Sequence, residues 1–360
     1  MLNCGAKVML IFEINHIFAQ KFSKKITMTH ILGIGNALVD ALVQVNNDLI
    51  LSELNLPKGS MQLIDTERYH SLQNRMEAYA PKRTTGGSAC NTMLAIAHLG
   101  GQPGLIGKIG HDEPGRFFAK AFKEHGVKTK MLYDAELPTG VASTFITPDG
   151  QRTFGTYLGA AGNMQPRDLQ PRYLRGYDYL YIEGYLVQNH DLIRRAVRFA
   201  HRSSMKVCVD MASYNIVHDD WDFFNELLHH TDIVFANELE AEAFTDCRMA
   251  EFNVRALGKM CDIAVVKVGK KGVLVRHGEE QVFCPAREVP NVVDTTAAGD
   301  YFSAGFLHAL SEGQSLQTAA RLGSLLAGHI IEVIGTALPE HTWQKIRNEY
   351  QSWKNTNTQG

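Results

Sequence analysis

Residues 294–310, DTTAAGDYFSAGFLHAL, place small residues directly before one carboxylate and an apolar helical pattern. The carboxylate is Asp300. One interpretation is structural, because aspartate is a preferred residue at the start of a helix and small residues suit a tight turn. The other is chemical: unobstructed backbone amides at a helix N-terminus attract an anion, and Asp300 would lie beside it. This stretch alone leaves both interpretations open.

The stretch GIGNALVD, residues 33–40, follows a buried-looking apolar run. It begins like a dinucleotide-binding fingerprint, but Leu38 stands where the third glycine is needed, so a dehydrogenase is only weakly indicated. Asp40 could accept hydrogen bonds from two sugar hydroxyls, with Asn36 beside it. A turn stabilised by these two polar side chains explains the same residues equally well.

The stretch TTGGSACNTMLAIAHLGG, residues 84–101, enters an Ala- and Leu-rich helical pattern. Gly86 and Gly87 would let the backbone approach a ligand closely. Ser88 is a good helix cap, which is the simpler account of it. Asn91 lies one turn inside the expected helix, where asparagine is a poor helix former, so it is a candidate to bind a hydroxyl-bearing ligand.

Arg152, in PDGQRTF, lies in a segment expected to project from the main domain. A lone surface arginine is usually just solvated, but above a phosphate site it could approach the transferred group and help to exclude water. Asn237 and Glu240, in VFANELEAEAF, have i, i+3 spacing on one helical face. They could hold a hydrated magnesium ion through its water, although a capping box at the helix start explains the spacing slightly better.

The stretch VVKVGKKGV follows another apolar strand and contains Lys267, Gly269 and Gly272, which we take as nucleotide-binding candidates. The glycines suit a flat base packed on the backbone, and a plain hairpin explains them equally well. Together, the carboxylate at an anion site, the hydroxyl-binding set, the magnesium pair and the arginine are the parts of phosphoryl transfer to an alcohol. The sequence has no GxxxxGK[ST] motif, so the anion site would be of another kind.

The composition is that of an ordinary globular protein of 360 residues, 45% hydrophobic and 21% charged. The net charge of -2 gives no overall basic field for nucleic acid or an anionic membrane, and no apolar run reaches the ~18 residues of a membrane span. Six scattered cysteines without a CxxC pair argue against a zinc site or disulfide framework and predict the cytoplasm. Residues 1–27 are interpreted as an extension outside the fold, and residues 28–360 as one domain.

Short β-branched runs alternate with helical patterns along most of the chain. Strands are expected within 30–45 and in the runs QPGLIGKIG, YDYLYIEG, MKVCVDMAS, TDIVFANE and CDIAVVKVG; helices are expected at 89–99, 114–125, 190–202, 221–229, 238–245 and 300–311. This alternation predicts an α/β fold with a doubly wound, mostly parallel sheet covered on both faces, and ligands beyond the carboxyl ends of its strands. Residues 41–64 and 131–160 alternate apolar and polar side chains and are expected to form a small β-sheet lid.

With these residues in view, the chain resembles the ribokinase (PfkB) family of carbohydrate and nucleoside kinases. GGSACNTMLAIAHLGGQPGLIGKIGHDEPG resembles the family's N-terminal signature, DTTAAGDYFSAGFL resembles its C-terminal signature, and NELE matches its N-x-x-E motif. The likeness covers about residues 30–340, with the motifs in the family's order. It implies a three-layer α/β/α sandwich with a β-sheet lid, using ATP and Mg²⁺, and leaves open the use of a monovalent cation such as K⁺.

The resemblance also implies roles for the site residues. Asp300 would be the catalytic base, and Asn237 with Glu240 would order Mg²⁺ and phosphate through water. The anion hole would be formed by the amides of Ala297, Ala298 and Gly299. The family's usual pattern is G-A-G-D, so Ala297 replaces a glycine, and the site would be strained if this residue must adopt a positive φ.

The acceptor implied by the resemblance is a nucleoside. GNALVD is similar to the G-N-P-L-x-D of adenosine kinases, which assigns Asn36 and Asp40 to the nucleoside, and Arg152 resembles a residue of their lid. Gly87, Ser88 and Asn91 would surround the ribose. The alternatives are a sugar kinase for ribose, fructose or a related carbohydrate, a nucleoside-binding protein without catalysis, and a dehydrogenase. The expected partners are small molecules, and the chain could be a monomer or a homodimer.

Overall fold

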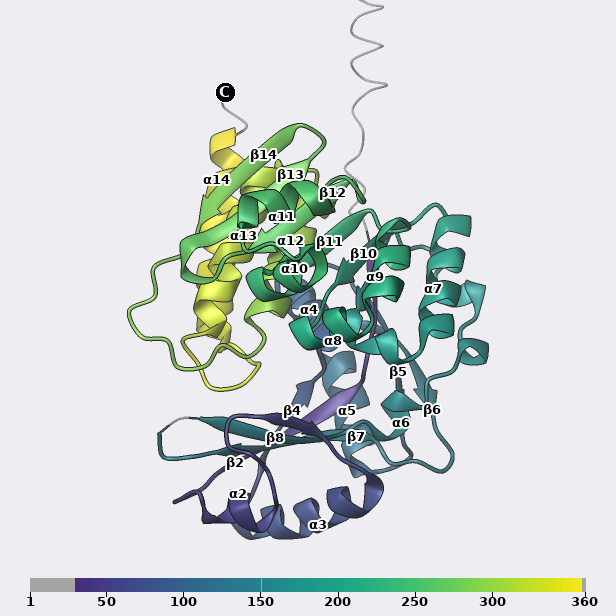
Figure 1. Cartoon of the computed structure of the whole chain (residues 1–360), viewed down its shortest axis with the longest axis vertical. Coiled ribbons are helices and arrows are strands. Elements are labelled where there is room, and N and C mark those ends of the chain that lie inside the picture. The colour runs from purple at the N-terminus through teal and green to yellow at the C-terminus, as the bar shows by residue number, and fades with distance from the viewer. Residues whose placement is uncertain (1–29, 150, 358–360) are drawn as a thin grey trace, which may run out of the picture.

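A nine-stranded sheet forms the centre of the molecule, in a computed structural model that describes residues 30–149 and 151–357 (Figure 1). Seven strands, β1, β5, β6 and β9 to β12, run parallel to one another, and the β13–β14 hairpin adds an antiparallel edge. In spatial order the strands are β14 (Glu280–Pro285), β13 (Gly272–His277), β12 (Ile263–Lys267), β11 (Ile233–Asn237), β10 (Lys206–Asp210), β9 (Tyr179–Glu183), β1 (Ile31–Ile34), β5 (Gly104–Ile109) and β6 (Lys128–Tyr133). The predicted doubly wound α/β sandwich is confirmed.

Helices cover both faces of this sheet because its strands are apolar on both sides. In β12, Ile263 and Val265 belong to one core cluster, and Ala264 and Val266 belong to the cluster on the opposite face. The first face is covered by α4 (Ser88–His98), α5 (Glu113–Glu124), α12 (Ala298–Ser311), α13 (Leu316–Ile330) and α14 (Glu340–Asn357). The second is covered by α7 (His190–Arg202), α8 (Tyr214–Asp219), α9 (Trp221–Leu228), α10 (Glu238–Thr245) and α11 (Ala250–Leu257).

A second, five-stranded sheet lies at one end of the molecule, at the bottom of Figure 1. Its spatial order is β3 (Met61–Leu63), β8 (Arg152–Tyr157), β7 (Gly140–Ile146), β2 (Leu38–Gln44) and β4 (Lys82–Gly86). The helices α2 (Leu49–Glu53) and α3 (Thr66–Met76) pack on its outer side, and α6 (Gly159–Gly162) follows β8 in the chain. We refer to this element as the small sheet.

The sequence located the small sheet only approximately. Strands β2 and β3 fall within or across the predicted segment 41–64, and β7 and β8 fall within 131–160, but residues 49–53 form a helix and β4 was not expected. The segment 131–160 also begins too early, because residues 128–133 are β6 of the large sheet. This strand lies at the edge of the large sheet, and its side chains alternate in exposure. That alternation is typical of a strand with one face in solvent. The proposed extension, residues 1–27, lies outside the described residues.

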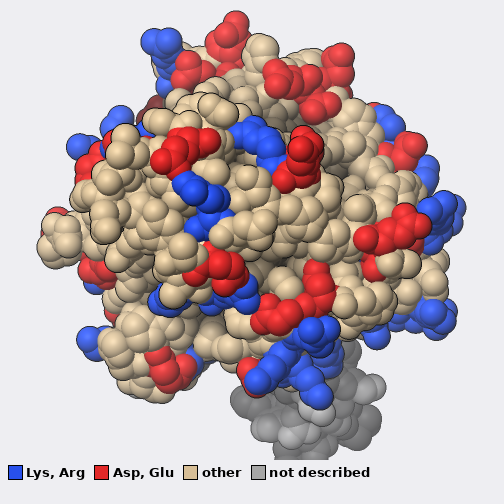
Figure 2. Space-filling view, turned by 90° about the horizontal axis from the view of Figure 1, so that it is seen from below, with Lys and Arg blue, Asp and Glu red and all other residues tan. Residues whose placement is uncertain are grey.

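The surface on the side of the small sheet carries Lys and Arg side chains interspersed with Asp and Glu side chains (Figure 2). This mixture agrees with the near-zero net charge of the whole sequence. Within residues 30–149 and 151–357, none of the helices combines the length and apolar character that crossing a membrane requires.

Helix α12 begins after a residue with an unusual backbone conformation. Ala297, the N-cap of this helix, has φ 61° and ψ 6°, in the left-handed region. This conformation costs an L-residue roughly 1–2 kcal/mol, whereas glycine adopts it freely. The sequence analysis expected strain here only if Ala297 adopts a positive φ, and the structure meets that condition.

We expect A297G to raise the melting temperature by about 1–3 °C. Glycine relieves the left-handed strain, and its greater freedom in the unfolded chain offsets part of that gain, which leaves a net stabilisation of roughly 0.5–1 kcal/mol. Thermal unfolding of purified protein measures the shift. The control is A298G, one residue further on in regular helix, which should lower stability by up to about 1 kcal/mol. Equal destabilisation by both changes would contradict the strain at Ala297.

Candidate functional site

A cleft of about 1050 Å³ opens where three parallel strands of the large sheet end. The last residues of β10, β11 and β12 are Asp210, Asn237 and Lys267, and all three line it. The N-terminus of α12 forms another part of the wall. Among the residues proposed from the sequence, the cleft is lined by Ser88, Asn237, Glu240, Lys267, Gly269, Gly272, Ala297, Ala298, Gly299 and Asp300. The cleft thus lies at the carboxyl ends of the strands, as expected for an open α/β sheet.

The backbone at the start of α12 provides hydrogen-bond donors to this cleft. Within residues 30–149 and 151–357, the amides of Ala297 and Gly299 have no acceptor, and the amide of Ala298 makes one long bond of 3.3 Å to the carbonyl of Thr295. A Cβ added to Gly299 would lie 3.0 Å from Nζ of Lys267, so this ammonium group is next to the amides. Free amides, a helix N-terminus and an ammonium group together suit a phosphate group.

Asp300 lies between the N-termini of two helices. The hydroxyl of Ser88 donates to its Oδ1 at 2.6 Å, and Nδ2 of Asn91 donates to its Oδ2 at 2.9 Å. Burial raises the pKa of Asp300 to about 6; the hydrogen bonds from Ser88 and Asn91 lower it, the charge of Asp210 raises it, and Lys267 lowers it. Ser88 is not a helix cap: Gly87 occupies the N-cap of α4, and Ser88 binds the carboxylate instead.

Asn91 keeps one polar atom without a partner. Its Oδ1 is buried and, within the described part of the chain, has no hydrogen-bond donor. Burying an unsatisfied amide oxygen is costly, typically by about 1–3 kcal/mol. This orphaned acceptor is therefore suited to a hydroxyl donor supplied by a ligand.

Asn237 and Glu240 form the capping box that the sequence slightly favoured. The amide of Glu240 donates to Oδ1 of Asn237 at 2.9 Å, and the amide of Asn237 donates to Oε2 of Glu240 at 2.7 Å. Burial, assisted by Asp210, raises the pKa of Glu240 to about 7 against the lowering effect of Lys267. In the described part of the chain, His, Cys, Asp and Glu residues form no group of three that could bind a metal directly. This donor set fits a hydrated Mg²⁺ held through water, since each carboxylate oxygen retains a further lone pair.

Lys267 lines this cleft together with Lys270 and Arg287, and it is held by a carboxylate that the sequence did not identify. Its Nζ donates to Oδ2 of Asp210 at 3.4 Å, and its side chain is 17% exposed. Burial lowers the pKa of Lys267, but the charges of Asp210, Glu240 and Asp300 outweigh this and raise it. The ammonium group therefore stays charged at neutral pH.

Gly269 and Gly272 form the turn between β12 and β13, so the hairpin interpretation is correct, and both also line the cleft. Gly272 has φ 129°, and a Cβ there would lie 2.1 Å from the carbonyl oxygen of Cys284. Only glycine fits this position.

The small sheet contributes a second group of candidate residues beside Asp300. Asp40 lies on β2, and a Cβ on Gly86 of the neighbouring β4 would lie 2.2 Å from its Oδ1. Arg152, on β8, forms an ion pair of 2.7 Å with Asp294 in the loop before α12. Burial raises the pKa of Asp40 to about 7, opposed by Arg152 and assisted by Asp300 and Asp294. The small sheet thus brings Asp40 and Arg152 to the side of the site opposite the strand ends.

Asn36 is 4% exposed and donates from Nδ2 to Oε1 of Glu183 at 2.8 Å. Glu183, the last residue of β9, also accepts the amide of Ala89 at 3.0 Å. Burial raises the pKa of Glu183 to about 7, although its hydrogen bonds oppose the shift. The buried carboxylate of Glu183 therefore holds both Asn36 and the start of α4.

Sequence reasoning missed Asp210, Glu183 and Asp294. The first two end the apolar runs MKVCVD and YLYIE, and a carboxylate at the carboxyl end of a parallel strand is a signal that could have identified them. Asp294 stands at the start of the same small-residue stretch as Asp300. Its partner Arg152 is far away in sequence, so only the fold reveals the pair.

Comparisons with known proteins agree with this geometry. Residues 55–343 match the model of the pfkB family of carbohydrate kinases. An aminoimidazole riboside kinase of Salmonella typhimurium is 31% identical over 240 residues, covering 63% of this chain and 73% of the relative. An adenosine kinase of Saccharomyces cerevisiae is 26% identical over 331 residues, covering 85% of this chain and 96% of that protein.

A solved structure supports the same assignment. The crystal structure of adenosine kinase from Sinorhizobium meliloti superimposes with a TM-score of 0.80 at 34% identity, covering 90% of this chain and all of that chain. The family match spans most of the described residues, including both signature stretches and the cleft between them. The chain therefore belongs to the pfkB family of carbohydrate kinases.

Proposed function

We propose that this kinase transfers the γ-phosphoryl group of ATP to the primary hydroxyl of a nucleoside, and that the nucleoside is adenosine, which would give AMP. The observation that carries the proposal is the position of Asp300, a carboxylate in the cleft beside the free amides of Ala297 and Gly299. This arrangement offers a proton acceptor for a hydroxyl and donors for a phosphoryl group in one place.

In this proposal Asp300 accepts the proton of the attacking hydroxyl. The amides of Ala297, Ala298 and Gly299 stabilise the negative charge of the migrating phosphoryl group, and the ammonium of Lys267 adds a nearby positive charge. Bound Mg²⁺ supplies further charge neutralisation on the phosphates, and Asn237 and Glu240 would hold it through water. The remaining lining of the cleft, including Gly269 and Gly272, would receive the nucleotide.

The acceptor would lie between the small sheet and Asp300. Asp40 and Asn36 would bind its hydroxyls, and the orphaned Oδ1 of Asn91 would accept one more. Arg152 would approach the transferred group from the small sheet and help to exclude water. The riboside and adenosine kinases among the relatives favour a nucleoside over a free sugar.

A substrate panel tests the choice of acceptor. Adenosine, inosine, ribose, fructose and fructose phosphate are compared by ADP release at matched concentrations. We expect adenosine to have the highest kcat/KM. Asp40, Asn36 and Asn91 would bind the ribose that adenosine and inosine share, so they separate the nucleosides from the hexoses, and the preference for adenosine over inosine rests on the resemblance to adenosine kinases. A free hexose preferred over both nucleosides would replace the proposal by a sugar kinase, and tight adenosine binding without ADP release would indicate a binding protein.

The variant D300N tests the proton acceptor. We expect kcat to fall by roughly 10²–10⁴-fold with a much smaller change in adenosine affinity, because the amide keeps the shape of the side chain but cannot take the proton. Steady-state kinetics and calorimetry measure the two effects. The matched control is D65N, an aspartate that caps α3 far from the cleft and should leave kcat unchanged. Near-normal turnover of D300N would remove Asp300 as the base.

The pH profile tests the environment of Asp300. Because the ionised form accepts the proton, we expect kcat/KM to be lost as pH falls through about 6, the raised pKa of Asp300, and not near 4 as for an ordinary aspartate. Asp40 and Glu183, both with a pKa of about 7, add to the same acid limb.

A variant of Lys267 tests in which direction the acid limb of this pH profile moves. Its charge lowers the pKa of Asp300, so K267M should move the acid limb to higher pH, whereas K271M, an exposed lysine of the same turn, should not. An acid limb near pH 4, or a shift to lower pH in K267M, would contradict the proposed environment.

A further inference from the structure

In the described part of the chain, four segments pass between the large and small sheets. Two lie early in the sequence: residues 35–37 connect β1 to β2, and Gly87 connects β4 to α4. Two come later: residues 134–139 connect β6 to β7, and residues 158–165 lead from β8 back toward the large sheet. The position of the small sheet depends on these segments, which we call the early and late crossings.

The early crossings are fastened by one buried carboxylate of the large sheet. Glu183 is 2% exposed and binds both Nδ2 of Asn36 and the amide of Ala89, one residue beyond Gly87. The two crossings also contact each other, since a Cβ on Gly87 would lie 2.0 Å from the carbonyl oxygen of Asn36.

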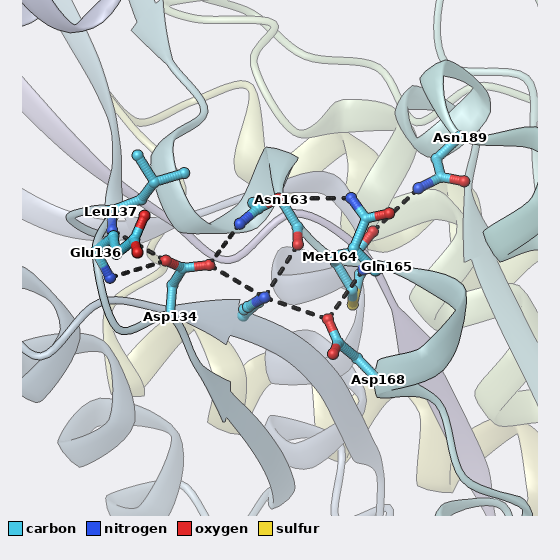
Figure 3. Close-up of polar contacts among 9 residues, drawn as sticks. Asp134, Glu136, Leu137, Asn163, Met164, Gln165, Asp168 and Asn189 are labelled. Carbon is cyan, nitrogen blue, oxygen red and sulfur yellow. Dashed lines mark hydrogen bonds and ion pairs between the residues drawn. The ribbon is translucent and has the colours of Figure 1, made fainter.

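The late crossings are held by one buried ammonium group of the large sheet, whose partners Asp134, Asn163 and Asp168 are labelled in Figure 3. Lys108 lies on β5, and its Nζ contacts Oδ2 of Asp134 at 3.1 Å, at the start of one crossing. It also donates to the carbonyl oxygen of Asn163 at 3.0 Å and to Asp168 at 3.2 Å. Both residues lie in the chain that leads from β8 back to the large sheet. Three partners match the three donors of an ammonium group, so Lys108 joins both crossings to β5.

The partners of Lys108 are themselves held in place. Asp134 accepts the amides of Glu136 and Leu137 and, at 2.7 Å, Nδ2 of Asn163. Burial raises the pKa of Asp134, but the hydrogen bonds from Leu137, Glu136, Asn163 and Lys108 outweigh burial and hold it well below its usual range. The side chains of Lys108 and Asp134 are only 10% and 7% exposed. The loss of hydration on burial offsets much of the attraction in such an ion pair, so the pair is weak evidence for added stability.

Further contacts also hold the crossing from β6 to β7, among them the bond from the amide of Gly110 to the hydroxyl of Thr139 at 2.9 Å. The amide of Ala160, on the returning chain, donates to the carbonyl of Pro138 at 2.8 Å. The amide of Thr139 donates to Oδ2 of Asp112 at 2.7 Å, at the start of α5. The late crossings are therefore bound to each other as well as to the large sheet.

We propose that Lys108 is a positioning residue of this kinase, which sets the place of the small sheet relative to α12 by binding Asp134, Asn163 and Asp168. Asp40 and Arg152 are carried by the small sheet, and Asp300 is carried by α12. The crossings that Lys108 binds therefore help to set the distance between these groups, together with the early crossings held by Glu183 and the ion pair of Arg152 with Asp294. The nucleotide cleft is lined chiefly by elements of the large sheet and the loops around α12, so it does not depend on this fastening.

The variant K108M tests this role by hydrogen exchange of the free protein. Without the ammonium group, the Asp134 carboxylate keeps three hydrogen bonds, and the Asp134 amide keeps its bond to the carbonyl of Ile109 in β5. What is lost is the side-chain link that joins β5 to Asp134, Asn163 and Asp168 together. We expect the amides of β7 and β8 to exchange at least about tenfold faster, with β10, β11 and β12 unchanged. Unchanged exchange in β7 and β8, or an equal rise in β10 to β12, would overturn the proposal.

The matched control is K206M. Lys206 also lies between two aspartates, at 3.7 Å from Asp232 and 3.4 Å from Asp262, but at the opposite end of the sheet's strands from the crossings. Its loss should leave exchange in β7 and β8 unchanged. If K108M does not fold, D168N is used instead, because it weakens the returning chain's link and retains the side chain's shape.

A kinetic measurement adds a second readout and rests on the proposed function. In K108M we expect the KM for adenosine to rise by roughly tenfold, because Asp40 and Arg152 are misplaced, while the KM for ATP stays constant. Equal rises in both values would indicate general loss of structure and overturn the positioning role. Failure of the wild-type protein to phosphorylate adenosine would count against the proposed function alone, since the exchange experiment needs no acceptor.

Discussion

The site depends on one carboxylate held between the starts of two helices. Asp300 belongs to α12, but its two oxygens are bound by Ser88 and Asn91 of α4, more than half the chain away. Burial raises the pKa of Asp300, the hydrogen bonds from Ser88 and Asn91 lower it, and the resulting pKa is about 6. The carboxylate is thus ionised at neutral pH and close to the range in which it can take and release a proton.

Charge around Asp300 is arranged in two regions that meet at this residue. On the side proposed for the nucleotide, Lys267 lies among carboxylates and next to free amides, which suits a group with several negative charges. On the side proposed for the phosphoryl acceptor, Asp40 and Glu183 are buried, and Arg152 is already paired with Asp294. This second region therefore offers mostly hydrogen-bond acceptors, which would suit a neutral molecule rich in hydroxyl groups.

The sequence predicted the elements better than their partners. The strands β5 and β9 to β12 and the helices that follow the pattern were expected, because buried parallel strands read as short apolar runs. Asp300 was placed correctly in a cleft, and the strain at Ala297 was anticipated from the missing glycine. The edge strand β6 was assigned to the small sheet, although it belongs to the large one. A strand with one solvent-exposed face shows the same alternation of polar and apolar residues in either sheet.

The remaining features of the site could not be predicted from the sequence, because they depend on contacts between residues that are far apart in the chain. Ser88 looked like a helix cap, and only the fold shows that it binds Asp300 instead. Lys108 stands in the apolar run LIGKIG, where a lysine signals a buried counter-charge, but nothing in the sequence says that Asp134 and Asp168 supply it. The spacing within a motif locates a residue along the chain, whereas its partner is fixed by topology.

The small sheet is not an insertion that could be removed from the chain. Its strand β2 pairs in parallel with β7, Leu38 lying beside Gly140, and the chain between them builds α4, β5, α5 and β6 of the main domain. Any cut that excised the small sheet would take two strands of the large sheet with it. The two sheets are interleaved in sequence, and so they must be inherited, expressed and engineered as a single unit.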